Sequence, residues 1–395
     1  MKALGPKVLI VALRSDWLGI SRLPRELHRA GIRVAALCLP EAYLRQTRYV
    51  DWYYLLRQPS PQAAHWRQAL VQAVADWRPL LIIPGDDPAT LFLHETLLAG
   101  NGVSNPCLPP RIHRSVSNSL GDPCYFGATI NKNLTHRVAA ELGVRAPPQR
   151  TVAVWADAME FFSEQRGNAV VLKHPLSWAG IDVHVCRTRK QLRAAFEALQ
   201  DPPPARVPDH GRPGSRAGAP VVSSADEGLR LRIERFIEGT PASYALAAWR
   251  GELLAGYPLL KEQFFPPDTG PASVVRALKH QEITATAKAL TSRFKLTGFA
   301  EFDFMIERRT GRAFLLECNA RPSMLSVVGS RFGVDLSLAL AARLRGQSLP
   351  AMRLRSGKRV ALFPQAWWSE PANPLLHTPA HDVPWDDPGL VKHLV

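Results

Sequence analysis

Short apolar runs alternate with amphipathic stretches in the first third of the chain. Residues 8–13 and 34–39 are almost uniformly apolar, which is typical of strands buried on both faces. Residues 20–30, between them, carry apolar side chains at helical spacing. A third apolar run, 80–83, follows a helical pattern at 63–77. Strands that alternate with helices predict an open parallel sheet. The first run is not followed by G-x-G-x-x-G, so the fingerprint of a dinucleotide site is absent.

Two acidic residues follow the apolar run 80–83, in the sequence Pro84-Gly85-Asp86-Asp87. The carboxyl ends of parallel strands are where open α/β sheets bind ligands, so these acids are candidates for substrate contact. They also directly precede a predicted helix at 88–98, and Asp is favoured as a helix N-cap. We favour the capping role.

A different pattern, with period two, dominates the region around residue 310. Residues 298–307 and 313–321 alternate apolar and polar positions on either side of Thr310-Gly311. Alternation around a glycine turn predicts an antiparallel hairpin. The apolar faces of the two strands match when Glu307 is paired with Ala313.

This register has consequences for the polar face of the hairpin. Asp303 then lies opposite Glu317, and Glu301 opposite Asn319. Opposed side chains are about 5 Å apart and like charges there destabilise a sheet, so the carboxylates require a cation. Oxygen ligands suit Mg²⁺, which usually also takes phosphate oxygens. Arg321 reaches the same face and can bind an anion bidentately. The competing interpretation is a solvated hairpin with an acidic outer face.

A lysine that leaves a strand is placed to bind phosphate, and a second lysine lies on a predicted amphipathic helix, where a surface position is the simpler interpretation. Lys132 lies near the start of a predicted helix at 125–142. Lys173 leaves a buried strand at 169–172 and is followed by a loop, 174–180, that contains His174 and a single glycine. A compact ammonium group suits phosphate as a point charge. His174 is a candidate general base, although a structural role is commoner for a lone loop histidine.

The remaining segments complete the expected organisation. Residues 201–228 are rich in Pro, Gly and Ser, cannot pack a core, and are predicted to be a flexible insertion. Apolar patterns predict a strand at 229–237, helices at 280–294 and 334–345, and a last strand at 360–363. The tail beyond it is aromatic and Pro-rich and is expected to pack over the core or a partner.

Composition narrows the class of protein. A chain of 395 residues suggests two or three domains, and 46% hydrophobic with 21% charged residues is ordinary for a soluble protein. The net charge of +15 is spread along the chain without a zinc finger, an RNP motif or a dense basic block. This distribution favours anionic small molecules over nucleic acid. A nucleic-acid binder is the rival interpretation and predicts strongly salt-dependent affinity.

Cysteine usage and hydropathy point to the expected compartment. The five cysteines show no C-x-x-C spacing and are odd in number, which favours reduced thiols. The N-terminal apolar run is too short for a signal peptide, and no stretch approaches the ~18 apolar residues of a membrane span. We therefore expect a cytoplasmic protein with no membrane partner.

The hairpin also carries a family resemblance. Glu301-x-Asp303 followed by Glu317-Cys-Asn319-Ala-Arg321 resembles the metal-binding end of the ATP-grasp superfamily, in particular its carboxylate–amine ligases. The resemblance implies that Asp303, Glu317 and Asn319 bind Mg²⁺, with Mn²⁺ as an alternative, against ATP. It implies that Arg321 is the catalytic arginine that contacts phosphate or acyl phosphate. Whether Glu301 takes part is left open.

Upstream segments extend the resemblance over about residues 122–346. INKNLTHRVAAELGVRAPP is similar to the family segment in which a lysine, here Lys132, contacts ATP phosphate, and Lys173 matches a second such lysine. In LRLRIERFIEG, Glu234 matches the adenine-binding glutamate, while Arg235 and Ile237 match the backbone contributors.

Other positions match less closely. Arg276 matches a basic residue placed on phosphate or substrate, beside a Pro/Gly loop. The loop after Lys173 has one glycine where the family has a Gly-rich flap. Pro241, Ala242 and Ser243 stand where several relatives have a ribose-binding acid, which puts the ribose contact in doubt.

The resemblance implies a fold class and a domain division. The expected fold is α/β, with an N-terminal open parallel-sheet (pre-ATP-grasp) domain followed by a two-lobed α+β ATP-grasp domain. The expected units are the pre-ATP-grasp domain at 1–120, the ATP-grasp domain at 121–350 and a C-terminal strand and tail at 351–395. Within the ATP-grasp domain we expect a small lobe at 121–200, the insertion at 201–228 and a metal-binding lobe at 229–350.

The implied activity is Mg·ATP-dependent ligation. ATP phosphorylates a carboxylate, an amine attacks the acyl phosphate, and an amide-type bond, ADP and phosphate result. The expected partners are a small-molecule carboxylic acid and an amine, with no nucleic acid, and a homodimer is compatible with the family. Two alternatives stay open: a carboxylase or carbamoyl-phosphate-type ligase that uses bicarbonate, and a non-catalytic ATP-binding regulator.

Overall fold

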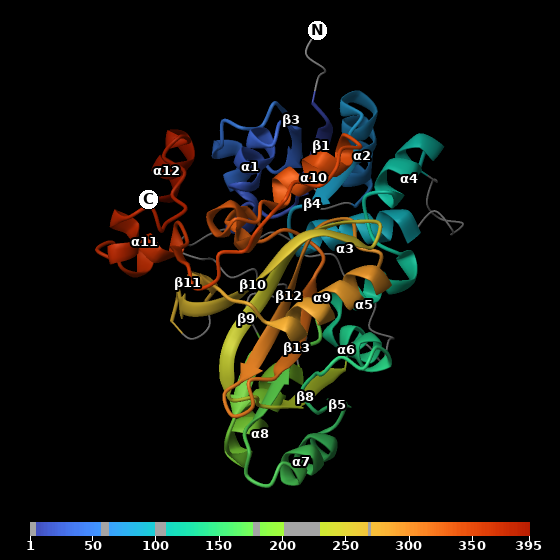
Figure 1. Ribbon diagram of the computed structural model, residues 1–395. Coiled ribbons are helices and arrows are strands. Elements are labelled where there is room, and N and C mark those ends of the chain that lie inside the picture. Colours follow the sequence, from blue (N-terminus) through green and yellow to red (C-terminus); the bar gives the residue numbers. More distant parts are fainter. Residues whose placement is uncertain (1–4, 57–62, 99–107, 177–181, 201–229, 268–269) are drawn as a thin grey trace.

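The structure is a computed structural model, and it describes residues 5–56, 63–98, 108–176, 182–200, 230–267 and 270–395. Three sheets follow one another along the long axis of the molecule (Figure 1). A parallel sheet lies at one end, a six-stranded antiparallel sheet lies in the middle, and a small antiparallel sheet lies at the other end. The predicted insertion at 201–228 lies outside the described residues.

The N-terminal domain is built on the parallel sheet that the apolar runs predicted. Its strands have the order β3-β2-β1-β4, and side chains of β1 and β2 are buried on both faces. The elements are β1 (Lys7–Ala12), α1 (Leu23–Arg29), β2 (Arg33–Cys38), β3 (Trp52–Leu55), α2 (Ala63–Trp77), β4 (Leu81–Pro84), α3 (Asp87–Leu98) and α4 (Pro110–Ser117).

Two short helices connect this domain to the small lobe. We predicted one helix over 125–142, but the structure has α5 (Phe126–Ile130) and α6 (Lys132–Glu141) instead. The break occurs because Asn131 is extended and its side-chain oxygen accepts the N–H groups of Asn133 and Leu134 as an N-cap. Lys132 is therefore the first residue of a helix.

The small lobe contains an antiparallel sheet of order β5-β8-β6-β7 with two helices packed on it. Its elements are β5 (Gln149–Val152), α7 (Trp155–Glu164), β6 (Val170–Lys173), β7 (Val183–Cys186), α8 (Arg189–Gln200) and β8 (Leu231–Arg235). Our division assigned residues from 229 onward to the metal-binding lobe. The structure places β8 in the small sheet instead, because it pairs with both β5 and β6.

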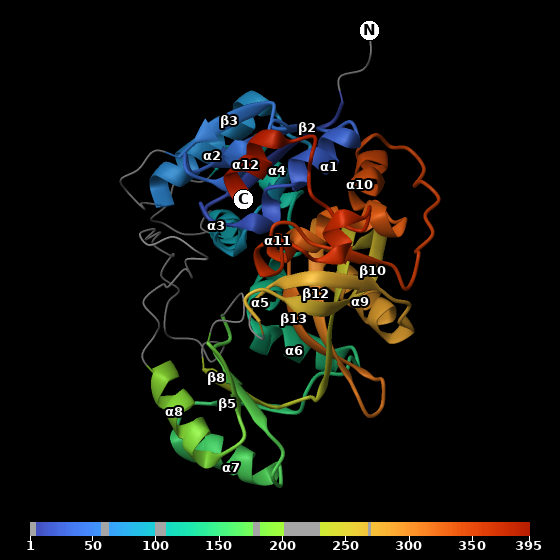
Figure 2. The same cartoon turned by 90° about the vertical axis from the view of Figure 1, so that its left-hand side faces the viewer.

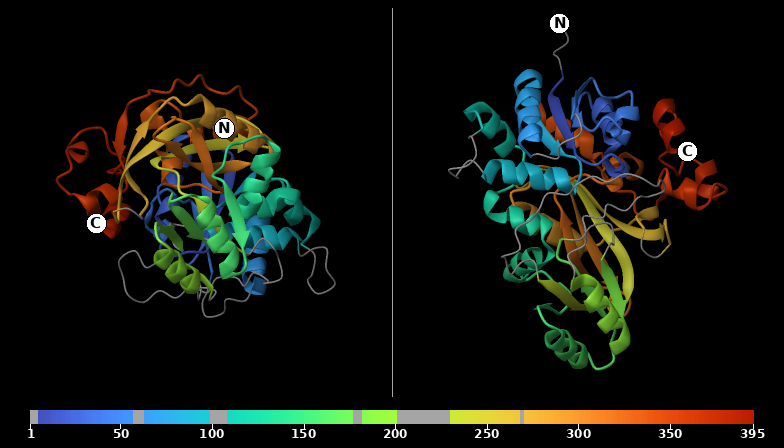
Figure 3. Two further views of the ribbon diagram at one scale, coloured as in Figure 1. Left: turned by 90° about the horizontal axis from the view of Figure 1, so that it is seen from below. Right: turned by 180° about the vertical axis from the view of Figure 1, so that it is seen from behind.

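The central sheet has the order β13-β12-β9-β10-β11-β14, and its faces pack against different partners. One face shares a continuous core with the N-terminal domain, and the other packs against α6 and α9 (Figure 3). The elements are β9 (Gly239–Trp249), β10 (Glu252–Phe264), β11 (Ala272–Ala277), α9 (Gln281–Arg293), β12 (Gly298–Glu307), β13 (Ala313–Asn319), α10 (Leu336–Leu344) and β14 (Arg359–Ala361).

The C-terminal segment packs back on the N-terminal domain, as expected for the tail (Figure 2). It contains α11 (Gln365–Ser369) and α12 (Pro388–Leu394). Arg22 pairs with Asp382, and Arg25 lies 2.7 Å from Asp386. Among the helices of the described residues, none is long and apolar enough to cross a membrane.

A truncation in β12 tests the importance of the central sheet. Phe302 is fully buried between β13 and β9, in the core that faces α6 and α9. We expect Phe302→Ala to lower the free energy of unfolding by about 3–5 kcal/mol, since it removes a large side chain and leaves a cavity. Urea denaturation measures this loss. Leu338→Ala, at an exposed position on α10, is the control and should change little. A similar small effect of both variants would contradict the assignment.

Candidate functional site

The hairpin of β12 and β13 has the predicted register at its chemically important end. Asp303 lies opposite Glu317, and Glu301 lies opposite Asn319. Toward the turn the prediction was wrong, because Ile306 rather than Glu307 faces Ala313. The shift arises from a β-bulge in β13 at Leu316, between the partners of Asp303 and Phe304.

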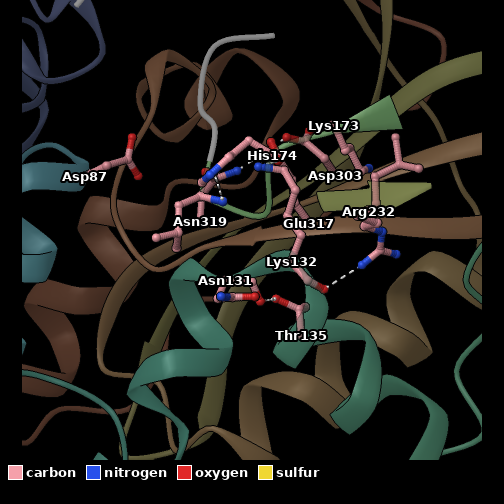
Figure 4. A network of polar contacts seen from close by, with 12 residues as sticks. Asp87, Asn131, Lys132, Thr135, Lys173, His174, Arg232, Asp303, Glu317 and Asn319 are labelled. Atoms are coloured by element: carbon pink, nitrogen blue, oxygen red, sulfur yellow. Dashed lines mark hydrogen bonds and ion pairs between the residues drawn. The ribbon is translucent and has the colours of Figure 1, made fainter. Parts of the chain in front are cut away.

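Lysine side chains compensate the opposed carboxylates, and Figure 4 shows Lys132 in the same network as Asp303 and Glu317. Lys261 on β10 places Nζ 2.6 Å from Asp303 Oδ1, which also accepts the hydroxyl of Ser243. Lys132 places Nζ 3.0 Å from Glu317 Oε2. Burial alone would lower the pKa of Lys261, but Asp303 and Glu301 outweigh it and raise that pKa, so Lys261 stays charged.

The donor set on this face fits Mg²⁺. Asp303 and Glu317 offer carboxylates, and Asn319 lies beside them, with its amide nitrogen 3.3 Å from Asp303 Oδ2. In the described part of the chain, no three His, Cys, Asp or Glu side chains form a group that could hold a metal ion. Mg²⁺ is commonly bound by one or two carboxylates together with substrate phosphates, so two carboxylates and an amide are a sufficient protein contribution. The assignment of these three residues as ligands stays a prediction.

Lys173 and Glu234 form a buried ion pair in the small lobe. Lys173 Nζ lies 2.7 Å from one Glu234 oxygen, and Arg232 Nε donates to the other at 2.9 Å. Burial alone would raise the pKa of Glu234, but Lys173 and Arg232 outweigh it and lower that pKa to about 2. The carboxylate predicted to meet adenine is therefore engaged on both oxygens and holds Lys173, the lysine predicted to bind phosphate, in place.

Arg232 continues this network toward the hairpin. Its Nη1 donates to the carbonyl of Lys132 at 2.8 Å, and its Nη2 donates to His136 Nδ1. His136 Nε2 lies 2.9 Å from the carbonyl oxygen of Leu316, the bulged residue. Arginine only donates and a carbonyl only accepts, so His136 is neutral with its proton on Nε2. Burial and Arg232 lower the pKa of His136 well below its usual value, in agreement with this tautomer.

The predicted adenine connector crosses from the small sheet to the central sheet. Arg235 ends β8, and its guanidinium carbon lies 6.0 Å from the centre of the Phe314 ring. Phe236 donates its N–H to the carbonyl of Ala169, and Ile237 is buried. The backbone contacts of Arg235 and Ile237 with adenine stay a prediction.

Arg321 meets the N-terminal domain at Asp87. Its Nε and Nη2 lie 2.7 and 2.8 Å from the two oxygens of Asp87, and its Nη2 also lies 3.2 Å from Asn319 Oδ1.

The predicted helix-capping role is confirmed for Asp86, which accepts the N–H of Ala89 at 2.8 Å. Asp87 instead faces the site, so the neighbouring acids have different roles.

Of two further sequence candidates, Arg276 has other surroundings, whereas His174 belongs to the same polar network as Lys132 and its catalytic role stays a prediction (Figure 4). Arg276 lies opposite Leu260, on the other face of the sheet from Lys261, and pairs with Glu262. The period-two alternation of β10 thus keeps Arg276 away from the carboxylates, and Lys261 is the basic residue there. His174 accepts the N–H of Leu176 at 3.3 Å, a local loop contact. Residues 177–180 of that loop lie outside the described residues.

Sequence reasoning missed Arg232 and His136. Arg232 alternates with Glu234 in a strand where Leu231 and Ile233 take the other face, and His136 lies one helical turn after Lys132. Both spacings place these residues beside predicted site residues. That adjacency was a readable signal, although nothing in it indicated that Arg232 and His136 contact each other.

Comparison with known proteins agrees with this fold. No family model and no curated protein matches the chain in sequence. Solved structures do match in three dimensions. The biotin carboxylase domain of Hydrogenobacter thermophilus 2-oxoglutarate carboxylase, bound to MgADP, ADP and bicarbonate, has a TM-score of 0.61 at 15% identity over 90% of this chain and 73% of that one.

Two ligase structures match comparably. Staphylococcus aureus N5-carboxyaminoimidazole synthetase with ADP has a TM-score of 0.60 at 12% identity, over 89% of this chain and 80% of that one. Bacillus licheniformis L-amino acid ligase has a TM-score of 0.55 at 15% identity, over 87% and 75%. These neighbours are ATP-grasp enzymes. The chain therefore has the ATP-grasp fold, as the hairpin motif predicted.

The buried histidine predicts a pH dependence of stability. The pKa of His136 is lowered in the folded state, so below about pH 6.5 the unfolded chain binds a proton that the folded chain excludes. Stability is therefore lost as the pH falls below that value. We expect His136→Gln to remove this contribution, so that the loss between pH 6 and pH 5 is smaller than in wild type by roughly 1 kcal/mol. Urea denaturation across this range measures both slopes, and equal slopes would contradict the neutral assignment.

Proposed function

We propose that this protein is an ADP-forming, ATP-dependent carboxylate–amine ligase that activates a carboxylate as an acyl phosphate. One observation carries the proposal. Asp303, Glu317 and Asn319 share one face of the hairpin. Lys132 of α6 contacts Glu317 on that face, and Arg321 contacts Asn319. Acids that would bind a metal are thus surrounded by cations that would bind phosphate. The ADP and MgADP bound to two of the structural neighbours support the same cofactors, ATP and Mg²⁺.

Each residue has a definable task in this proposal. Asp303, Glu317 and Asn319 would hold Mg²⁺, which neutralises phosphoryl charge. Lys132, already 3.0 Å from Glu317, would contact phosphate beside the metal, and Lys173 would do so from the small lobe. Arg321 would stabilise the acyl phosphate where the hairpin meets the N-terminal domain. Catalysis of this kind is mainly positioning and electrostatics, and it requires no nucleophilic side chain.

A second candidate is a ligase that uses bicarbonate as the acid. It is favoured by the carboxylases among the structural neighbours, one of which is bound to bicarbonate. The non-catalytic regulator is the third. Two further predictions are that the protein acts in the cytoplasm and that it forms a homodimer. The dimer of the Hydrogenobacter thermophilus domain supports the second.

The test is ADP release from Mg·ATP in the presence of pooled carboxylic acids with amino acids and amines. Wild type and Glu317→Gln are compared, with bicarbonate as a separate arm. Glu307→Gln is the matched control, because Glu307 lies on the same hairpin at its turn end. We expect Glu317→Gln to lower turnover at least about a hundredfold, since one metal-ligating charge is lost, while Glu307→Gln resembles wild type.

The outcomes separate the candidates. Substrate-dependent ADP release in wild type and Glu307→Gln, but not in Glu317→Gln, supports a ligase, and stimulation by bicarbonate alone supports the second candidate. ATP binding without stimulation by any pool favours the regulator. Full activity of Glu317→Gln would contradict the metal assignment.

A further inference from the structure

The loop after β1 contains two buried N–H donors with no hydrogen-bond partner among the described residues. Arg14 is 3% exposed, and its Nε and Nη2 donate to the two oxygens of Asp16 at 3.0 and 2.9 Å. Its Nη1 is buried without a partner. The same holds for Nε1 of Trp17, three residues along the chain.

Such donors are uncommon in folded proteins because each loses its bonds to water on burial. The loop that carries them is firmly held. Asp86 Oδ2 accepts the N–H groups of Leu13 and Arg14 at 2.8 and 2.9 Å, which fixes the start of the loop against the end of β4. The unpartnered donors therefore belong to an ordered segment, and a ligand that offers acceptors would satisfy them.

The donors lie beside the proposed reaction centre. The Trp17 ring has the Arg321 guanidinium carbon 4.7 Å from its centre and that of Arg14 at 5.2 Å. Arg321 in turn contacts Asn319, a proposed metal ligand. Trp17 thus contacts both Arg14 and the arginine that follows the hairpin. Both donors follow β1, at the sheet edge where open α/β folds bind ligands.

We propose that Arg14 Nη1 and Trp17 Nε1 bind a second carboxylate of the acid substrate, so that the activated acid is a dicarboxylic acid. This inference rests on the proposed ligase function. The reacting carboxylate of the dicarboxylic acid would lie near Asn319 and Arg321, and the distal carboxylate of the same acid would lie at the loop after β1. Two N–H donors match the two oxygens of one carboxylate. An ammonium group finds no acceptor in this pair, and a phosphate dianion is disfavoured by the neighbouring Asp16 and Asp87.

One conservative substitution isolates the contact. Trp17→Phe removes the Nε1 donor but keeps an aromatic ring beneath Arg321. It deletes an unpartnered buried donor, so we expect no loss of thermal stability in the ligand-free protein. Trp77→Phe is the matched control, because Trp77 Nε1 donates to the carbonyl of Val8 at 2.9 Å in the same domain. That variant should lower Tm by a few degrees and leave ligand binding unchanged.

The probes are the linear dicarboxylates from malonate to adipate, each compared with the monocarboxylate of the same chain length at equal ionic strength. Binding is measured by calorimetry and by the shift in Tm. We expect at least one dicarboxylate to bind wild type while its monocarboxylate partner binds at least about tenfold more weakly. We expect Trp17→Phe to weaken that binding about tenfold and Trp77→Phe to retain it.

Two results would overturn the inference: no dicarboxylate binds in preference to its monocarboxylate partner, or Trp17→Phe binds the dicarboxylate like wild type. Neither readout requires turnover. Failure of the ligase proposal appears in the ADP assay as loss of the difference between wild type and Glu317→Gln, so the two failures are distinguishable. If turnover is present, Trp17→Phe should raise KM for the acid and leave kcat unchanged, which a purely structural role would not produce.

Discussion

The repulsion between Asp303 and Glu317 is the constraint on which the site depends. These carboxylates face each other across β12 and β13, where like charges destabilise a sheet. Lys261 and Lys132 compensate them from β10 and α6. The central sheet must bring β10 to the acidic face, and the N-cap at Asn131 must place Lys132 at the start of a helix. The hairpin proposed to bind Mg·ATP thus has its acidic charge balanced by lysines of the chain itself.

A second buried network links the lobes through the backbone. Lys173, Glu234, Arg232 and His136 form a chain of contacts from the small sheet to the carbonyl of Leu316. Leu316 directly precedes Glu317, and the bulge makes its carbonyl accessible to α6. Lys173, proposed to bind phosphate, and Glu317, proposed to bind the metal, are therefore held in one connected arrangement. Breaking a buried network of this kind is costly because the charges that remain lose their partners.

The sequence was informative where periodicity constrains geometry and silent where contacts join distant segments. The alternation of apolar and polar residues was sufficient to predict the pairing of Asp303 with Glu317, since a slip of one residue between the strands would expose the apolar face. It could not predict the bulge at Leu316, whose carbonyl oxygen contacts His136 on a different element. The face of Arg276 was misjudged because that residue was matched by its position beside a Pro/Gly loop, not by strand alternation. The pairing of Asp87 with Arg321 joins residues 234 positions apart and left no local signal.

That last contact unites the two parts of the proposed active site. Arg321 follows Asn319, a proposed metal ligand, pairs with Asp87 at the start of α3, and packs over Trp17 in the loop after β1. In the proposed function the hairpin binds the phosphorylated end of the acid, whereas the β1 loop belongs to the N-terminal domain. Since the shared core joins this domain to the central sheet, the two sets of residues keep a fixed spacing. The N-terminal domain can therefore select the length of the substrate, measured from Arg321 to Arg14. Changes in the β1 loop would alter that length while the residues proposed to bind ATP stay the same.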